Sequence, residues 1–132
     1  SPAYLATWGE PRHPSALAQH RAVIYARRDE ESNTRWAFKK GDESCDVEVP
    51  VRTIVRDGIG LVDAAVGGCG IARPSDRAAR DAIASGQLRA LLADWTGSRR
   101  SVSAVLPPHA RAMPAKVQVF LDYAADRLRS AA

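Results

Sequence analysis

Residues 51–75, VRTIVRDGIGLVDAAVGGCGIARPS, decide the fold because their hydrophobic pattern changes twice. The β-branched residues up to Arg56 predict a strand. Asp57 is a typical N-cap, and it predicts a helix to about Val66 that Gly67-Gly68 ends. Residues 69–73 then predict a short buried strand. This order of strand, helix and strand predicts a crossover connection in an α/β fold.

Upstream, Val47, Val49 and Val51 alternate on one face, which predicts a long strand ending near Arg56. Pro50 lies inside it and marks either a sheet edge or a bend. Ser1-Pro2 begins a predicted helix over 3–8, and Gly9 ends it. Helical turns are expected over 15–20 and an apolar strand over 21–27. A further strand over 35–39 is followed by a turn at 40–43.

Downstream, Pro74-Ser75 begins a predicted helix that runs through Ser85. We expect a loop over 96–100, a strand over 102–106, and a last helix from Pro114 to about Ser130. The apolar residues of this last helix follow helical spacing: Val117, Phe120, Leu121, Ala124 and Leu128. Alternation of strands with helices predicts a mixed sheet flanked by helices.

The composition favours one folded domain with a mixed surface. The chain has 132 residues, a net charge of +4 and 26% charged residues. Its arginines are scattered among acidic residues, as in Arg77 to Asp81, so the basic balance indicates a solvated surface more than a polyanion site. No apolar run reaches the roughly 18 residues that a membrane span needs. The first residues show no signal-like pattern, and we expect the chain to start inside a longer protein or after processing.

Two cysteines are too few for a disulfide framework. Cys69 lies among apolar neighbours, which predicts a buried small side chain and argues against a nucleophile. A reducing cytosol fits both Cys45 and Cys69.

Gly58-Ile59-Gly60 begins like a dinucleotide-binding motif, but Asp63 replaces the third glycine and would repel a pyrophosphate. Two interpretations stay open for this turn. Free backbone N–H groups at the start of the helix suit a ligand carboxylate, or Asp57 simply caps the helix.

No catalytic or metal-binding pattern is visible. His13, His20 and His109 have no Cys or Asp partner at metal-ligand spacing, and no hydrolase, phosphate-loop or metalloprotease motif occurs. The chain is therefore expected to be neither an enzyme nor a cofactor-binding protein. Trp36 and Phe38 are compatible with stacking on nucleic-acid bases, although packing in the core is the favoured interpretation.

Taken in order, the motifs resemble the effector-binding domain of LysR-type transcriptional regulators over essentially the whole chain. The resemblance rests on Ser1-Pro2-Ala3-Tyr4-Leu5, Gly9, Pro11, His13-Pro14, Leu17, His20, Trp36, Phe38, Gly41, the strand 47–57, Ala64-Ala65, Gly68-Cys69-Gly70-Ile71-Ala72, Gly86-Gln87-Leu88, Trp95, Val105-Leu106-Pro107, Lys116-Val117, Phe120-Leu121-Asp122 and Tyr123.

This resemblance implies a fold like type 2 periplasmic binding proteins, in which two α/β subdomains flank a cleft. Residues 1–132 would be a partial effector-binding domain, with residues 15–100 as the core of the second subdomain. Residues 101–132 would be the returning strand and helix of the first, and the DNA-binding domain would be absent. The net positive charge would then not indicate DNA binding by this chain, because the DNA-binding element would lie elsewhere.

The resemblance also implies a small effector, often a carboxylate or aromatic metabolite, at the carboxyl ends of the strands. The expected binding residues are Arg27, Arg56, Asp57, Gly58, Arg73, Pro74 and Ser75. The three arginines could pair with an anionic effector through charge-assisted hydrogen bonds. Family members often carry an apolar residue where Arg73 stands, which indicates either an acidic ligand or a surface salt bridge.

The mechanism implied is a population shift that a homo-oligomer passes to DNA-binding segments in the cytoplasm. The chain alone is expected to bind effector weakly, and no membrane is expected as a partner. Three alternatives remain: a solute receptor of the periplasmic binding type, an enzyme of related fold using Asp57, and a module that binds nucleic acid with strong salt sensitivity.

Overall fold

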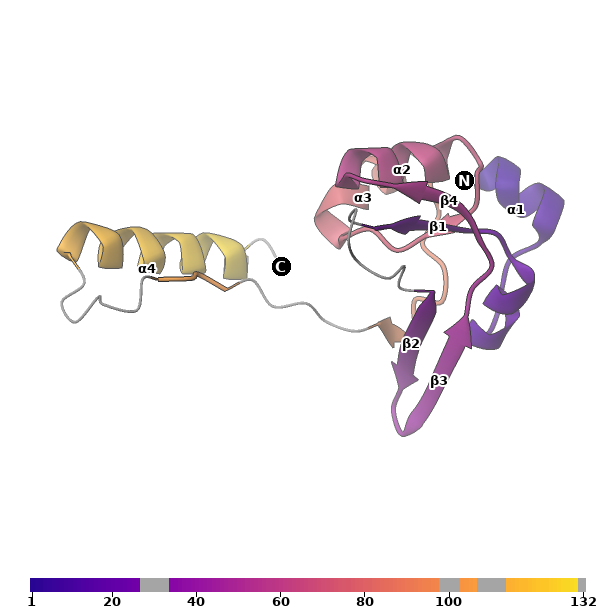
Figure 1. The fold of residues 1–132 in the computed structure, drawn as a ribbon, viewed down its shortest axis with the longest axis horizontal. Helices are drawn as coiled ribbons and strands as arrows, with labels where there is room; N and C mark the ends of the chain where they lie inside the picture. Colours follow the sequence, from indigo (N-terminus) through magenta and orange to yellow (C-terminus); the bar gives the residue numbers. More distant parts are fainter. Residues whose placement is uncertain (27–33, 98–102, 107–113, 131–132) are drawn as a thin grey trace. The chain divides into compact units, whose positions relative to one another are not determined.

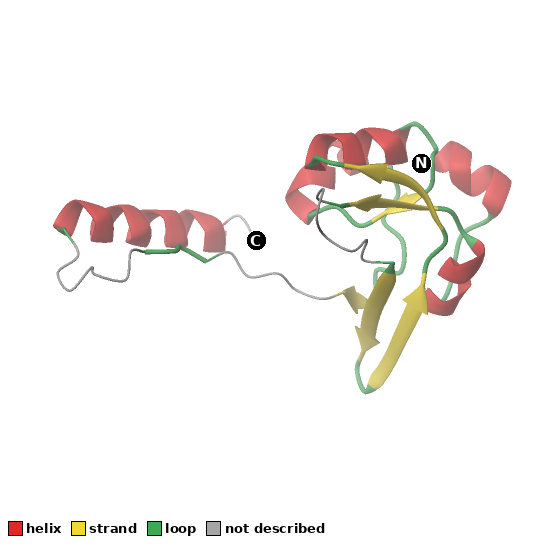
Figure 2. Cartoon of the chain, viewed as in Figure 1, coloured by secondary structure: helices red, strands yellow, loops and turns green. Residues whose placement is uncertain are grey.

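The computed structural model describes residues 1–26, 34–97, 103–106 and 114–130. The chain divides into two compact units, Ser1–Arg99 and Arg100–Ala132. The first unit holds two small sheets and the helices around them, and the second holds one long helix (Figures 1 and 2). Among the described segments, every helix falls short of the combined length and hydropathy that a membrane-spanning helix needs.

Helix α1 (Pro2–Trp8) begins and ends where the sequence predicts. The Ser1 hydroxyl accepts the N–H of Tyr4, and Gly9 ends the helix with a φ of 78°. The turns expected over 15–20 form a 3-10 helix, η1 (Pro14–Gln19), which buries Pro14 and Leu17. Local capping signals therefore suffice for this part of the chain.

The first sheet is parallel, with strand order β4-β1-β5. Its strands are β1 (Ala22–Tyr25), β4 (Val51–Val55) and β5 (Ile71–Ala72). Helix α2 (Gly58–Val66) connects β4 to β5 across β1, and α3 (Asp76–Ala84) packs beside it (Figure 1). Val23 is fully buried, and Ala22 and Ile24 nearly so, which confirms a strand covered on both faces.

The second sheet is antiparallel, with strand order β3-β2-β6. Its strands are β2 (Arg35–Lys40), β3 (Glu43–Glu48) and β6 (Thr96–Gly97). Trp36 pairs with Val47, and Phe38 pairs with both Cys45 and Gly97. The loop expected over 96–100 is thus wrong for Thr96 and Gly97, which form a strand too short to leave a periodic signal.

The single long strand expected over 47–56 is also wrong, because the chain changes sheets at Pro50. The Val49 N–H donates to Thr34 beside the antiparallel sheet, whereas the Pro50 carbonyl accepts the Ala22 N–H of the parallel sheet, both at 2.9 Å. Proline has no N–H to continue a ladder, so one sheet ends where the other begins. The bend that Pro50 predicts is confirmed.

The core lies between the two sheets. Trp36, Val47 and Val49 pack with Ile24 and Leu17, and a second buried cluster joins α2 and α3 through Ala65, Ala82 and Leu88. Because Trp36 is only 5% exposed, its packing role is confirmed and its face is closed to base stacking.

Two further expectations require correction. Cys69 is exposed rather than buried, because its N–H donates to the Ala64 carbonyl in the turn that ends α2 and its side chain points to solvent. The buried strand expected over 69–73 shrinks to the half-buried Ile71–Ala72. Of the strand expected over 102–106, residues 103–106 are described and form no strand, with Val105 94% exposed.

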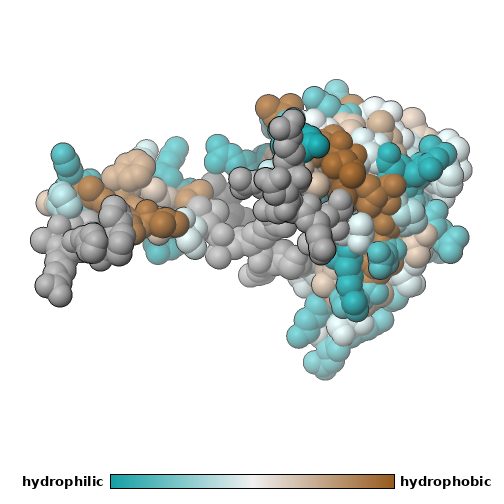
Figure 3. All heavy atoms as spheres, in the orientation of Figure 1, coloured by the Kyte–Doolittle hydropathy of each residue, from teal (hydrophilic) through white to brown (hydrophobic). Residues whose placement is uncertain are grey.

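The second unit contains α4 (Ala115–Ser130), which confirms the last predicted helix. Of its side chains over 115–129, none is buried, and the apolar ones that are most exposed are Val119, Phe120, Tyr123 and Leu128. Figure 3 shows apolar side chains at the surface of both units.

Candidate functional site

The carboxyl ends of the three parallel strands meet at one edge of the first sheet. Ala26 follows β1, Arg56 follows β4 and Arg73 follows β5. Because β1 pairs in parallel with both neighbours, these positions lie at the same edge. Arg27, which was expected to bind an effector here, lies outside the described residues.

At the end of β4, Asp57 caps helix α2. One carboxylate oxygen, Oδ1, accepts the Gly60 N–H at 2.7 Å, and Arg56, Asp57 and Gly58 are all exposed. The geometry agrees with the interpretation of Asp57 as a helix cap, because its carboxylate lies at the first turn of α2. A second anion at this helix end would meet that negative charge.

At the end of β5, Ser75 caps helix α3 through its hydroxyl, which accepts the Ala78 N–H at 3.3 Å. Pro74 is half-buried and Ser75 is exposed. Each of these two strands is therefore followed at once by a capped helix start, so the edge carries two helix N-termini.

Arg73 is half-buried and extends towards the second sheet. Its guanidinium carbon, Cζ, lies 5.4 Å from the ring centroid of Trp36 and 5.3 Å from that of Phe38. A planar cation over aromatic faces is attracted by the rings and held in a fixed orientation. The guanidinium is thus held in one orientation by the two rings. The sequence predicted an acidic ligand or a surface salt bridge for Arg73, and neither prediction included this stacking.

Shallow grooves occur among the described residues of the first unit, and two of them lie near its helices and its second sheet. One, of about 490 Å³, runs between α2 and α3 and includes Gly58 but none of the arginines expected to bind an effector. The other, of about 430 Å³, lies on the second sheet and its β6 edge. Neither is an enclosed pocket with convergent polar groups, which a complete small-molecule site requires.

A buried polar network near α1 was not predicted from the sequence. His20 is 7% exposed, and its Nδ1 lies 3.2 Å from the Tyr4 hydroxyl, whose oxygen accepts the Arg21 N–H at 2.9 Å. The Tyr4 O–H is then available to donate to Nδ1, which suits a neutral imidazole. Burial lowers the pKa of His20 below its ordinary value of 6.5. The pair is far apart in sequence, so only the tertiary fold reveals it.

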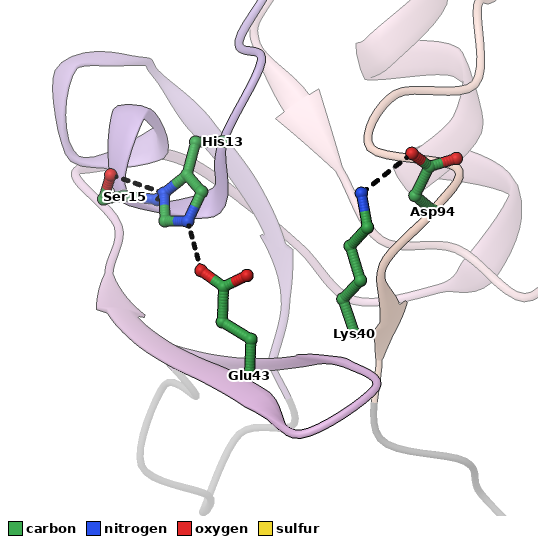
Figure 4. A network of polar contacts seen from close by, with 5 residues as sticks. All are labelled: His13, Ser15, Lys40, Glu43 and Asp94. Carbon is green, nitrogen blue, oxygen red and sulfur yellow. Dashed lines mark hydrogen bonds and ion pairs between the residues drawn. The ribbon is translucent and has the colours of Figure 1, made fainter.

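A second, exposed set of polar contacts surrounds the β2–β3 turn (Figure 4). His13 accepts the Ser15 N–H at its Nδ1, 3.2 Å away, and its Nε2 lies 3.3 Å from a Glu43 oxygen. Lys40 donates to Asp94 at 3.0 Å. His13 therefore serves as a cap of η1, and no group of three metal-ligating side chains occurs among the residues that the structure describes.

The family model for the LysR substrate binding domain matches residues 1–129. The chain belongs to this LysR family. Among curated relatives, an HTH-type transcriptional regulator of Xanthomonas campestris pv. campestris (strain 8004) is 32% identical over 97% of this chain and 38% of its own length. The uncharacterized HTH-type regulator YcaN of Escherichia coli K12 is 28% identical over 93% of this chain and 39% of its own. The LysR domain here thus spans about two fifths of these relatives.

Solved structures agree with this assignment. The regulatory domain of CrgA, a LysR-type transcriptional regulator from Neisseria meningitidis, superposes with a TM-score of 0.65 at 28% identity, covering 93% of this chain and 59% of that one. Full-length AphB of Vibrio cholerae, at 23% identity and a TM-score of 0.63 over 74% of this chain and 33% of its own, shares the fold. The LysR chain therefore has the periplasmic-binding-protein-like mixed α/β fold, and its family is one of transcription regulators rather than enzymes.

Proposed function

We propose that this chain is the effector-sensing part of a LysR-type transcription regulator and binds a small anionic molecule at the strand-end edge. The observation that carries the proposal is the parallel pairing of β4, β1 and β5, which brings the ends of all three strands to one edge. Ligands of open α/β sheets bind at this edge. The proposed site comprises the residues expected from the sequence, with the arginines as partners of the anion and Asp57 as the cap of α2: Arg27, Arg56, Asp57, Gly58, Arg73, Pro74 and Ser75.

The charges at the edge favour a carboxylate. A guanidinium stacked on aromatic rings, as Arg73 is, keeps its N–H groups in one plane for bidentate hydrogen bonds. Arg56 adds a second, exposed cation at the end of β4. The Asp57 carboxylate in the cap of α2 then disfavours a ligand with anionic groups at both ends of the edge.

Residues 15–100 are proposed to form one wall of the effector cleft and residues 101–132 to return to the other subdomain. The division of the chain at Arg99–Arg100 supports this assignment. The relatives are named HTH-type regulators and are more than twice as long as the matched segment. We therefore assign DNA binding to another segment of the regulator, which acts in the cytoplasm as a homo-oligomer and responds to effector by a population shift.

The proposal is tested in the intact regulator by a thermal-shift screen of small mono- and dicarboxylates, followed by titration calorimetry of the best ligand. Arg56→Ala is expected to weaken binding about 10- to 100-fold, the usual effect of losing a charge-assisted hydrogen bond. Arg52→Ala is the matched control, since Arg52 is an exposed arginine within β4. Equal affinity of the two variants would remove Arg56 from the site, and a regulator that binds no carboxylate would refute the anionic effector.

A further inference from the structure

The Arg73 side chain occupies the space that a side chain at position 97 would need. Phe38 on β2 is directly opposite Gly97 on β6, so the two residues share one face of the second sheet. A Cβ on Gly97 would lie only 2.7 Å from Nη2 of Arg73. The Arg73 side chain therefore covers Gly97 in addition to the rings of Trp36 and Phe38.

Strand β6 needs support from outside the sheet. It has two residues, both exposed, and its described contacts with β2 are two pairs in the ladder and a 2.9 Å hydrogen bond from the Thr96 hydroxyl to the Lys39 carbonyl. So short a strand is marginal in water unless something packs on it. The guanidinium over Gly97 supplies that packing on the inner face.

We infer that Arg73 is a positioning residue that holds β6 on β2, and that Gly97 is small because the arginine takes its side-chain space. Gly97 is the last described residue before the second unit, which begins at Arg100. Arg73 thus holds the last described segment of the first unit against the second sheet. The inference goes beyond the proposed function in assigning the arginine a role in the absence of any ligand.

One consequence does rest on the proposed function. The same guanidinium stands at the strand-end edge, so a carboxylate bound there competes with the two aromatic rings and Gly97 for its orientation. Occupation of the edge would then change how firmly β6 is held. Effector binding and the pairing of β6 with β2 are therefore coupled, because both depend on the orientation of the Arg73 side chain.

Hydrogen exchange of the intact protein, without ligand, tests the positioning role. In Arg73→Ala, peptides containing Thr96 and Gly97 are expected to exchange about tenfold faster, as the loss of two partly buried cation–π contacts implies. Peptides from β1 are the internal reference for global stability. Arg77→Ala on the adjacent α3 removes an exposed arginine and is the matched control.

Gly97→Ala provides an independent second variant. Its new Cβ meets only the far end of a flexible side chain, so the fold tolerates it while the guanidinium is pushed off the rings. Faster exchange confined to β6 in this variant supports the inference even where Arg73→Ala unfolds the protein. Exchange at β6 equal to that of Arg77→Ala in both variants overturns it. Since no effector is present, this result is separate from the carboxylate titration of Arg56→Ala.

Discussion

In the parallel sheet, three of the four side chains of β1 are buried, whereas β2 in the antiparallel sheet has one buried residue among six. The parallel strand lies between α2 on one face and the inter-sheet core on the other, so only its last residue, Tyr25, is exposed. The antiparallel strands pack on one face and leave the other to water. The two sheets therefore differ in how much of their stability depends on packing.

Their polar groups differ in the same way. Next to β1, His20, Tyr4 and the Arg21 N–H form a largely buried network of hydrogen bonds. On the second sheet, Arg35 pairs with Asp46 and Lys40 with Asp94 in exposed ion pairs. We expect the first arrangement to respond to pH and the second to salt, because buried groups are sensitive to their own charging and exposed pairs to screening.

Truncating the largest buried side chain of the second sheet should have the largest effect. Trp36→Ala is expected to lower the free energy of unfolding by about 3–5 kcal/mol, because a fully packed aromatic leaves a cavity between the sheets. Ile54→Ala on β4, where the side chain is 53% exposed, should cost at most about 1 kcal/mol. Urea unfolding measures both. A Trp36 effect as small as that of Ile54 would contradict the position of the core.

The parallel sheet has its own weak point at Gly70. A Cβ there would collide with the backbone carbonyl of Arg21, which accepts the Ile71 N–H at 2.8 Å and so begins the pairing of β1 with β5. Gly70→Ala is expected to destabilise the protein by about 2–4 kcal/mol, through overpacking against backbone that has little freedom to move. Gly41→Ala in the turn of the β2–β3 hairpin is the control. Gly41 has a φ of +58° and a Cβ there would have no atom within 4 Å, so this variant measures the cost of the backbone conformation without a steric clash. We expect it to lower the free energy of unfolding by about 1 kcal/mol.

Acid should reveal the buried network. The pKa of His20 is lowered in the folded protein, so the unfolded chain binds more protons once the pH drops towards 6.5. The stability that the neutral imidazole contributes is complete above pH 6.5 and is lost as the pH falls through the lowered folded value. Urea unfolding between pH 8 and pH 5 should show this decline. His20→Gln should flatten the profile in that window, and an unchanged slope would contradict the assignment.

The smallest expected effect belongs to the exposed ion pairs. Lys40→Ala removes the pair with Asp94 and should change stability by about 0.2–1 kcal/mol at low salt and by less at 1 M salt. A double-mutant cycle with Asp94→Ala isolates the pair. A coupling energy that is unchanged at about 1 M salt would contradict the conclusion that this ion pair is exposed and screened by solvent.

Local signals in the sequence predicted the helices better than the sheets. Ser1, Asp57 and Ser75 each cap the helix that they were expected to begin, because capping depends on neighbours within one turn. The division at Pro50 into two sheets and the pairing of Thr96–Gly97 with β2 depend on partners far away in the chain. No periodicity within those segments records that partnership.

The candidate site follows the same rule. The edge at which Arg56 and Arg73 stand was predictable, since it depends only on strands that are parallel. The orientation of Arg73 was not predictable, since Trp36, Phe38 and Gly97 approach it only after the second sheet has formed. The exposure of Cys69 was missed for a related reason: the turn after α2 decides where its side chain points, whatever its neighbours' hydropathy.

The chain changes sheets at Pro50 without losing its alternation. Val47 and Val49 before the crossing and Val51 after it all contact the same core cluster, so inward and outward positions keep one count across two sheets. Inserting or deleting a single residue between Glu48 and Val51 would reverse that parity and direct one sheet's apolar side chains to water. The length of this junction is therefore constrained, whereas most connections on a protein surface tolerate insertions and deletions.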